Sequence, residues 1–271
     1  MNGPIDRLLR RLQLRESPED EFLGGAGEGG IGGEARLFGG LVAAQAFVAA
    51  ARTVADVAVH SLHAYFLRPG RARNDIRYRV TRSKEGRNFQ VREVHAWQND
   101  ELIFQLQASF QRLETGVEHQ DTMPVVADPE SLPNRDALRG RSNWRDMPID
   151  VRMATPITAD TPLPAEQHIW LRMNGELPQD PALHAALVVY ASDRSLLDTA
   201  WRPHAGRGSL AGASLDHAMW FHRPPRFDDW LLYTMQSPAA GGGRGLAIGG
   251  LYDRQGRRVV TVAQEGVLRA R

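Results

Sequence analysis

The chain has 271 residues, 42% of them hydrophobic, and its 33 basic and 32 acidic side chains leave a formal net charge of +1 at pH 7. A charge this close to zero provides no general attraction to nucleic acid or to an anionic membrane, so we expect neither as a partner. Cysteine is absent, which excludes disulfide bonds and thiolate chemistry, and no apolar run approaches the ~20 residues of a membrane-spanning helix.

The first residues predict a short amphipathic lead-in and then a loop. Residues 1–23 alternate charged side chains with leucines and contain no visible secretory signal, so we expect a cytoplasmic protein. Residues 24–35 (GGAGEGGIGGEA) are rich in glycine but lack the Lys-Ser/Thr ending of a phosphate-binding P-loop. A flexible entry loop fits this run better than a phosphate cradle.

Two segments predict long helices. Residues 37–54 place apolar side chains at helical spacing, and the pair Gly39-Gly40 suits either the start of the helix or a point of close packing. Residues 181–192 form the second segment, with Pro181 at the first helical position behind Asp180 as the cap. Both segments are apolar around much of their circumference, so both helices should be buried.

An internal echo indicates that one unit is written twice. Residues 59–71 (VHSLHAYFLRPGR) and 213–226 (ASLDHAMWFHRPPR) each place an aromatic pair ahead of an Arg-Pro turn. Three strand-like runs with polar turns between them follow each copy, at 75–82, 88–98 and 101–111, and at 229–236, 243–252 and 258–268. The predicted unit is a buried helix followed by an antiparallel sheet.

The division between the units is expected in the low-pattern, proline-containing stretch between them. We predict an N-terminal unit over residues 1–122, a connector over 123–145 and a C-terminal unit over 146–271.

Six motifs occur in the order seen in one family. LFGGLVAAQAF, HSLHAYFLRPG, QASFQ, YASD, ASLDHAMWFHRP and TVAQEGVLR resemble the type II acyl-CoA thioesterases, the TesB-like family. The resemblance implies an α+β double hotdog fold: two repeats, each with a long helix buried against an antiparallel sheet, and the two sheets joined. It also implies hydrolysis of fatty acyl-CoA to free acid and CoA, with no metal and no cofactor.

The resemblance implies three water-holding residues: Asp193 in YASD, Ser214 in ASLDH and Gln264 in VAQEG. Ser214 stands where the family pattern has Thr, so the hydroxyl is kept and the methyl is lost. Direct attack by water also agrees with the lack of cysteine and of a GxSxG elbow. Gln107 looks like the first-half echo of Gln264, whereas Ala50-Ala51-Arg52 offers no first-half match for Asp193, so we expect one active site per chain.

Other side chains invite weaker hypotheses. Arginine suits phosphate, which makes Arg68, Arg87, Arg223 and Arg244 candidates for CoA binding, and Gly39-Gly40 could direct backbone N–H groups at the thioester oxygen. Each of these arginines fits a solvated turn better when taken singly. Two histidine patterns fit ordinary strand residues better than a metal site or a catalytic dyad: His60 with His63, and Asp216-His217 with His222.

Two other functions remain open at this point. A hotdog acyl-CoA hydratase expects a histidine five residues after its aspartate, but Asp198 occupies that position relative to Asp193. A non-catalytic acyl-CoA-binding protein could keep the same fold. Because exposed sheet edges favour pairing, we also expect a homodimer or homotetramer.

Overall fold

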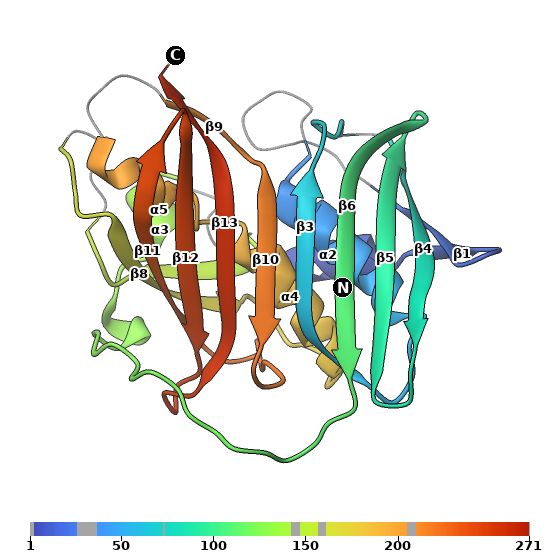
Figure 1. The fold of residues 1–271 in the computed structure, drawn as a ribbon. Helices are drawn as coiled ribbons and strands as arrows, with labels where there is room; N and C mark the ends of the chain where they lie inside the picture. Colours follow the sequence, from blue (N-terminus) through green and yellow to red (C-terminus); the bar gives the residue numbers. More distant parts are fainter. Residues whose placement is uncertain are drawn as a thin grey trace.

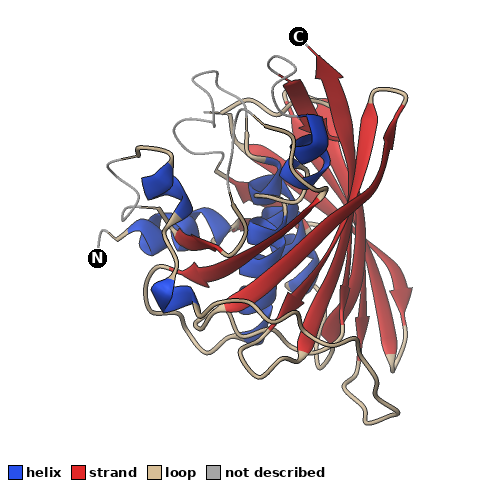
Figure 2. Cartoon of the chain, turned by 90° about the vertical axis from the view of Figure 1, so that its left-hand side faces the viewer, coloured by secondary structure: helices blue, strands red, loops and turns tan. Residues whose placement is uncertain are grey.

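A curved antiparallel sheet holds the helices on its concave side (Figures 1 and 2). The computed structural model describes residues 3–25, 37–72, 74–141, 147–156, 161–204 and 210–270. The first half contains α1 (Pro4–Leu12), β1 (Arg15–Ser17), β2 (Glu21–Gly24), α2 (Gly39–Ala51), β3 (Ala58–Phe66), β4 (Ile76–Glu85), β5 (Phe89–Gln98) and β6 (Glu101–Gln111).

A long connection and the second half complete the chain. The connection carries the 3-10 turn η1 (Pro129–Ser131) and the short helix α3 (Arg135–Leu138). The second half contains β7 (Ile149–Met153), β8 (Glu166–Met173), α4 (Pro181–Ser192), α5 (Asp198–Trp201), η3 (Arg202–His204), β9 (Leu210–Ser214), β10 (Asp216–Phe221), β11 (Leu231–Gly241), β12 (Arg244–Tyr252) and β13 (Arg258–Ala270).

The sheet joins the two halves through the strands of the sequence echo. The strand order is β1-β2-β4-β5-β6-β3-β10-β13-β12-β11-β8-β7, with β9 paired to β13. Strands β3 and β10 meet antiparallel at the centre, with Asp216 opposite Tyr65 and Trp220 opposite Ser61. The predicted hairpins β4-β5-β6 and β11-β12-β13 lie on either side, so the repeat is visible as an approximate two-fold arrangement.

The two predicted helices form the core behind the central strands. Ten residues of α2 and eight of α4 are buried, as their all-round apolar character predicts. Asp180 caps α4 by accepting hydrogen bonds from the amides of Ala182 and Leu183, at 2.9 and 3.3 Å. A Cβ at Gly40 would stand 2.5 Å from the carbonyl oxygen of Tyr190, so the start of α2 touches the end of α4 only because this residue is glycine.

Several elements go beyond the sequence prediction. The lead-in is a helix with Ile5, Leu8 and Leu12 buried in the core, and it continues into two short edge strands. Strands β7 and β8 extend the opposite edge, and the low-pattern connector contains α3. Of the glycine-rich run, residues 26–36 lie outside the described part of the chain.

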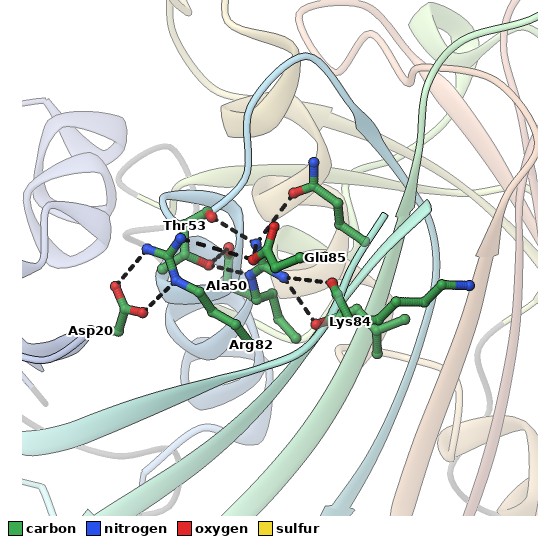
Figure 3. Close-up of polar contacts among 9 residues, drawn as sticks. Asp20, Ala50, Thr53, Arg82, Lys84 and Glu85 are labelled. Carbon is green, nitrogen blue, oxygen red and sulfur yellow. Dashed lines mark hydrogen bonds and ion pairs between the residues drawn. The ribbon is translucent and has the colours of Figure 1, made fainter. Parts of the chain in front are cut away.

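Polar contacts between the end of α2 and strands β4 and β5 tie the helix to the sheet (Figure 3). The side chain of Arg92 on β5 is fully buried and donates to the hydroxyl and carbonyl oxygens of Thr53 at 2.8 and 2.9 Å. It also reaches the carbonyl oxygen of Lys84 at 3.1 Å and pairs with the Glu85 carboxylate at 2.6 Å. Thr53 in turn donates to the Ala50 carbonyl, so this network satisfies helix-end carbonyls that would otherwise be unpaired.

Replacing Arg92 by methionine should lower the free energy of unfolding by about 3 kcal/mol, because buried carbonyl oxygens would lose their donors. Urea denaturation followed by circular dichroism measures this loss.

Arg82→Met is the matched control. Arg82 makes a two-point ion pair with Asp20, at 2.7 and 3.0 Å, but its side chain is half exposed, so the loss should stay below about 1 kcal/mol. Equal losses in the two variants would contradict the role given to Arg92.

Candidate active site

Three side chains from three separate elements converge at the end of α4. Asp193 is the residue that caps the helix C-terminus, Ser214 ends β9, and Gln264 lies on β13. The Ser214 hydroxyl donates to Asp193 Oδ1 at 3.0 Å, and Gln264 Nε2 donates to the same oxygen at 2.7 Å. Gln264 Nε2 also lies 2.7 Å from Ser214 Oγ. Pairing of β9 with β13, which puts Ser214 opposite Gly266, brings these groups together.

The second carboxylate oxygen of Asp193 faces the start of α2. A Cβ at Gly39 would stand 2.9 Å from Asp193 Oδ2, so only glycine leaves room for the carboxylate there. Phe38, the N-cap of α2, offers no side-chain acceptor to the first amides of the helix. These amides carry the positive end of the helix dipole, and the Gly40 amide donates a hydrogen bond to the Asp193 carboxylate.

The surroundings of Asp193 raise its affinity for a proton. Burial raises the pKa of this carboxyl above 3.8, and the hydrogen bonds from Gln264, Ser214 and the Gly40 amide oppose part of that increase. The nearby charge of Asp198 adds to the increase. A carboxylate with a raised pKa accepts a proton more readily than a solvated one, which suits general base catalysis.

Asp193 and Ser214 line a cavity of about 640 Å³, a volume typical of small-molecule sites. One part of its wall is apolar, formed by Val42, Phe66, Ile103, Phe104, Leu197 and Trp201. Another part carries the guanidinium groups of Arg68, Arg135, Arg139, Arg141 and Arg194. The cavity thus combines a hydrophobic wall, a cationic wall and a hydrogen-bonded carboxylate.

The matching position in the first half holds no such carboxylate. The residue that caps α2 is Arg52, whereas Asp193 caps α4. The expected echo of Gln264 in Gln107 is wrong by one residue: Gln107 pairs with His63, which corresponds through the repeat to Ala218 and its partner Ala263. A one-residue offset turns the side chain to the other face of the sheet, so Gln107 is exposed while Gln264 is buried.

The four arginines singled out from the sequence lie in different places. Arg68 lines the cavity and donates to the Leu102 carbonyl at 2.7 Å. Arg87, Arg223 and Arg244 lie outside the cavity lining. Arg87 sits on the β4–β5 turn, Arg223 pairs with Glu118 in the segment after β6 at 2.7 Å, and Arg244 pairs with Glu265 at 2.9 Å.

Sequence reasoning missed the arginines of the connector, at 135, 139 and 141. Their signal was the basic run RDALRGR directly before the second unit. A run of this kind is indistinguishable from a solvated surface until the fold places it against a cavity.

The histidines have structural partners. His217 is buried and shares a 2.8 Å hydrogen bond with Ser192, and burial lowers its pKa to about 4, so this pair anchors the end of α4. His60 contacts Ser109 Oγ at 2.7 Å, and His222 contacts Thr261 Oγ1 at 2.8 Å. In the described part of the chain, no three His, Asp or Glu side chains come close enough to hold a metal ion. None of the described helices is long and apolar enough to cross a membrane.

Comparison with known proteins identifies first the fold and then the family. The crystal structure of acyl-CoA thioesterase II from Mycobacterium marinum superposes with a TM-score of 0.83 and 38% identity, over 97% of this chain and 98% of that one. The tesB protein of Mycobacterium avium subs paratuberculosis gives 0.84 and 35%, over 98% and 99%. The fold is therefore the double hotdog that the six motifs implied.

Sequence matches lead to the same family. The acyl-CoA thioesterase family model matches residues 146–267, and the model of the acyl-CoA thioesterase N-terminal domain matches residues 29–111. Acyl-coenzyme A thioesterase 8 of Rattus norvegicus is 38% identical, over 100% of this chain and 92% of the relative. Acyl-CoA thioesterase 2 of Haemophilus influenzae is 36% identical, over 99% of both chains. The chain belongs to the type II acyl-CoA thioesterase family.

The raised pKa of Asp193 predicts a stability effect with a definite sign. The Asp193 carboxyl binds its proton more tightly in the folded state than in the unfolded state. Protonated Asp193 is therefore compatible with burial, and this contribution to stability is lost as pH rises from 3.8 through the folded-state pKa. Asp193→Asn should therefore raise the free energy of unfolding at pH 7 by about 1 kcal/mol, with the gain shrinking toward pH 4. Urea denaturation at both pH values measures the change.

Asp228→Asn is the control of opposite sign. Its ion pair with Arg226 lowers the pKa of Asp228 to about 2, so this variant should lose stability at pH 7. A loss of stability in Asp193→Asn as well would contradict the cost assigned to the buried carboxylate.

Proposed function

We propose that this protein hydrolyses fatty acyl-CoA to free fatty acid and CoA by direct attack of a water molecule held by Asp193, Ser214 and Gln264. The observation that carries the proposal is the meeting of these three side chains within hydrogen-bond distance, with Asp193 and Ser214 at the wall of one cavity and Gln264 buried behind them. They come from three motifs of an acyl-CoA thioesterase family that are far apart in the sequence. The relatives' names supply the substrate class.

The geometry leaves two acceptors for the attacking water. Asp193 Oδ1 receives the hydrogen bonds from Ser214 and Gln264, while Oδ2 faces Gly39. Gln264 Oε1 is buried and has no hydrogen-bond partner in the described part of the chain. A water donating one proton to Oδ2 and the other to Oε1 would satisfy both oxygens and direct a lone pair toward the cavity.

In this reaction the Asp193 carboxylate alone accepts the proton and later returns it. Asp193 takes a proton from the water as its oxygen bonds to the thioester carbonyl carbon, which forms a tetrahedral oxyanion. The oxyanion collapses, the carbon–sulfur bond breaks, and the departing CoA thiolate takes the proton from Asp193. The products are the fatty acid and CoA, and the carboxylate is regenerated.

The start of α2 supplies the electrostatic partner for the oxyanion. Its first amides, at Gly39 and Gly40, lie at the positive end of the helix dipole, and the Gly40 amide already donates to the Asp193 carboxylate. We place the thioester carbonyl oxygen against the Gly39 amide, where a removed donor typically costs 10²–10³-fold in rate. At the opposite end of the helix pair, Asp180 already occupies the first amides of α4, which supports a single active site per chain.

The other predictions remain open beside this function. An acyl-CoA hydratase would need a histidine where Asp198 stands, and a binding-only protein would have no use for three converging polar groups. The cytoplasmic location, the homodimer or homotetramer and the domain limits at 122 and 146 also stay predictions.

The catalytic assignment predicts a graded loss of turnover. Asp193→Asn should reduce kcat by about 10³-fold, and Gln264→Ala and Ser214→Ala by about 10²-fold, because each removes a group that activates or positions the water. Ser214→Thr keeps the hydroxyl and should retain activity within a few fold. Release of CoA thiol from acyl-CoAs of short to long chain, detected with DTNB, gives the rates against a cysteine-free background.

Asp56→Asn is a control, because Asp56 is an exposed aspartate in the loop after α2 and lies outside the lining of the active-site cavity. Asp56 has a φ of 59°, which asparagine adopts readily. The turnover of the Asp56→Asn variant should therefore equal that of the native protein. Near-native turnover in folded Asp193→Asn and Gln264→Ala would refute the assignment.

A further inference from the structure

The connector brings positive charge to the wall of the active-site cavity. Arg135 is the first residue of helix α3, and Arg139 and Arg141 follow the end of this helix. All three line the cavity together with Arg194, the residue after Asp193. Three of these four arginines therefore come from a segment that belongs to neither repeat.

Two of the four arginines are buried with unused donors. Only 4% of Arg135 is exposed; its Nη1 donates to Ser195 Oγ at 2.6 Å, but its Nε has no partner in the described part of the chain. The Arg194 side chain is 8% exposed, and its Nε is likewise unsatisfied among those residues. Buried donors without acceptors are costly, so such a pair indicates a site prepared for an acceptor.

Carboxylates balance only part of this charge. Asp136 is shared by Arg141 at 3.2 Å and Arg194 at 3.3 Å. Asp198 lies 3.9 Å from Arg139, at the outer limit of an ion pair. Among the residues that the structure describes, four guanidinium groups thus meet two carboxylates.

The mutual repulsion of the arginines has a visible consequence. Burial and the neighbouring charges of Arg194 and Arg139 lower the pKa of Arg135 to about 10. An anion entering the cluster would relieve this repulsion, whereas another cation would increase it. The cluster is therefore electrostatically incomplete without an anionic ligand.

We propose that Arg139 and Arg141 bind the phosphate groups of the CoA moiety, with Arg135 and Arg194 as the buried support behind them. This subsite rests on the proposed thioesterase function, since it recognises the leaving group of that reaction. The side chains of Arg139 and Arg141 are 44% and 43% exposed, so they can reach a ligand at the cavity wall. Guanidinium groups suit phosphate because their planar fork makes two parallel hydrogen bonds.

The subsite assigns different tasks to different parts of one cavity. The thioester lies at Asp193, the apolar wall is available to the acyl chain, and the flexible pantetheine arm carries the phosphates to the connector. Arg68, which comes from the first repeat and lines the same cavity, is anchored to the Leu102 carbonyl and contributes long-range attraction. The connector would then select CoA esters over thioesters without phosphate.

The test compares an acyl-CoA with the same acyl group carried on pantetheine, which lacks the phosphates. In R139Q/R141Q, KM for the acyl-CoA should rise about 10-fold or more, because charge-assisted hydrogen bonds are lost. Its kcat should stay within about 2-fold, and KM for the acyl-pantetheine should not change. R87Q removes an exposed arginine outside the cavity lining and should leave all these constants at their native values.

Binding of free CoA, measured by calorimetry, separates this subsite from the hydrolytic function. Native protein should bind CoA more tightly than dephospho-CoA or pantetheine, and R139Q/R141Q should lose that preference even if no thioester is hydrolysed. The single variant R139Q, whose ion pair is the weaker one, shows a partial effect if the double variant unfolds. The proposal is overturned if R139Q behaves like R87Q, or if KM rises equally for the two thioesters.

Discussion

The contact between the first turn of α2 and the C-terminal end of α4 is the one on which the site depends. Glycine at position 40 lets the backbone of α2 reach the Tyr190 carbonyl, and glycine at position 39 leaves room for the Asp193 carboxylate. One contact therefore packs the two repeats together and sets a helix N-terminus against a partly desolvated acid. A side chain at either position would separate the carboxylate from the dipole that opposes its desolvation.

The duplication explains both the fold and its functional asymmetry. The positions of Arg92 and Ala108, paired across β5 and β6, correspond to those of Ala247 and Gln264, paired across β12 and β13. In the first repeat the large side chain comes from β5, the outer strand of that pair, and its hydrogen bonds close the end of α2 (Figure 3). In the second repeat the polar group is Gln264 on β13, the inner strand, and its Oε1 has no hydrogen-bond partner among the described residues. The polar group is thus fully hydrogen-bonded in the first copy, whereas in the second copy its oxygen has no partner among the described residues.

Much of this arrangement could be predicted from the sequence because it is carried by local patterns. The apolar circumference of residues 181–192, the Asp180 cap and the hairpin turns each specify an element without reference to the rest of the chain. The position of Gln107 could not be predicted, because strand register depends on pairing and a one-residue offset reverses the face. The role of the connector could not be predicted either, because RDALRGR has no periodicity and gains meaning only beside the cavity.

The polar groups around the site carry a cost that the fold must offset. Three features destabilise the folded state relative to apolar replacements. They are the desolvation of Asp193, the Gln264 oxygen that lacks a partner among the described residues, and the repulsion between the arginines. The first repeat contributes the compensation, since its helix is closed by a buried network and its strands pair directly with those of the second. Because β3 and β10 share one ladder, the sheet of the second repeat is held in place by that of the first. Joining the repeats in one chain therefore allows a site that a single repeat would be less able to hold.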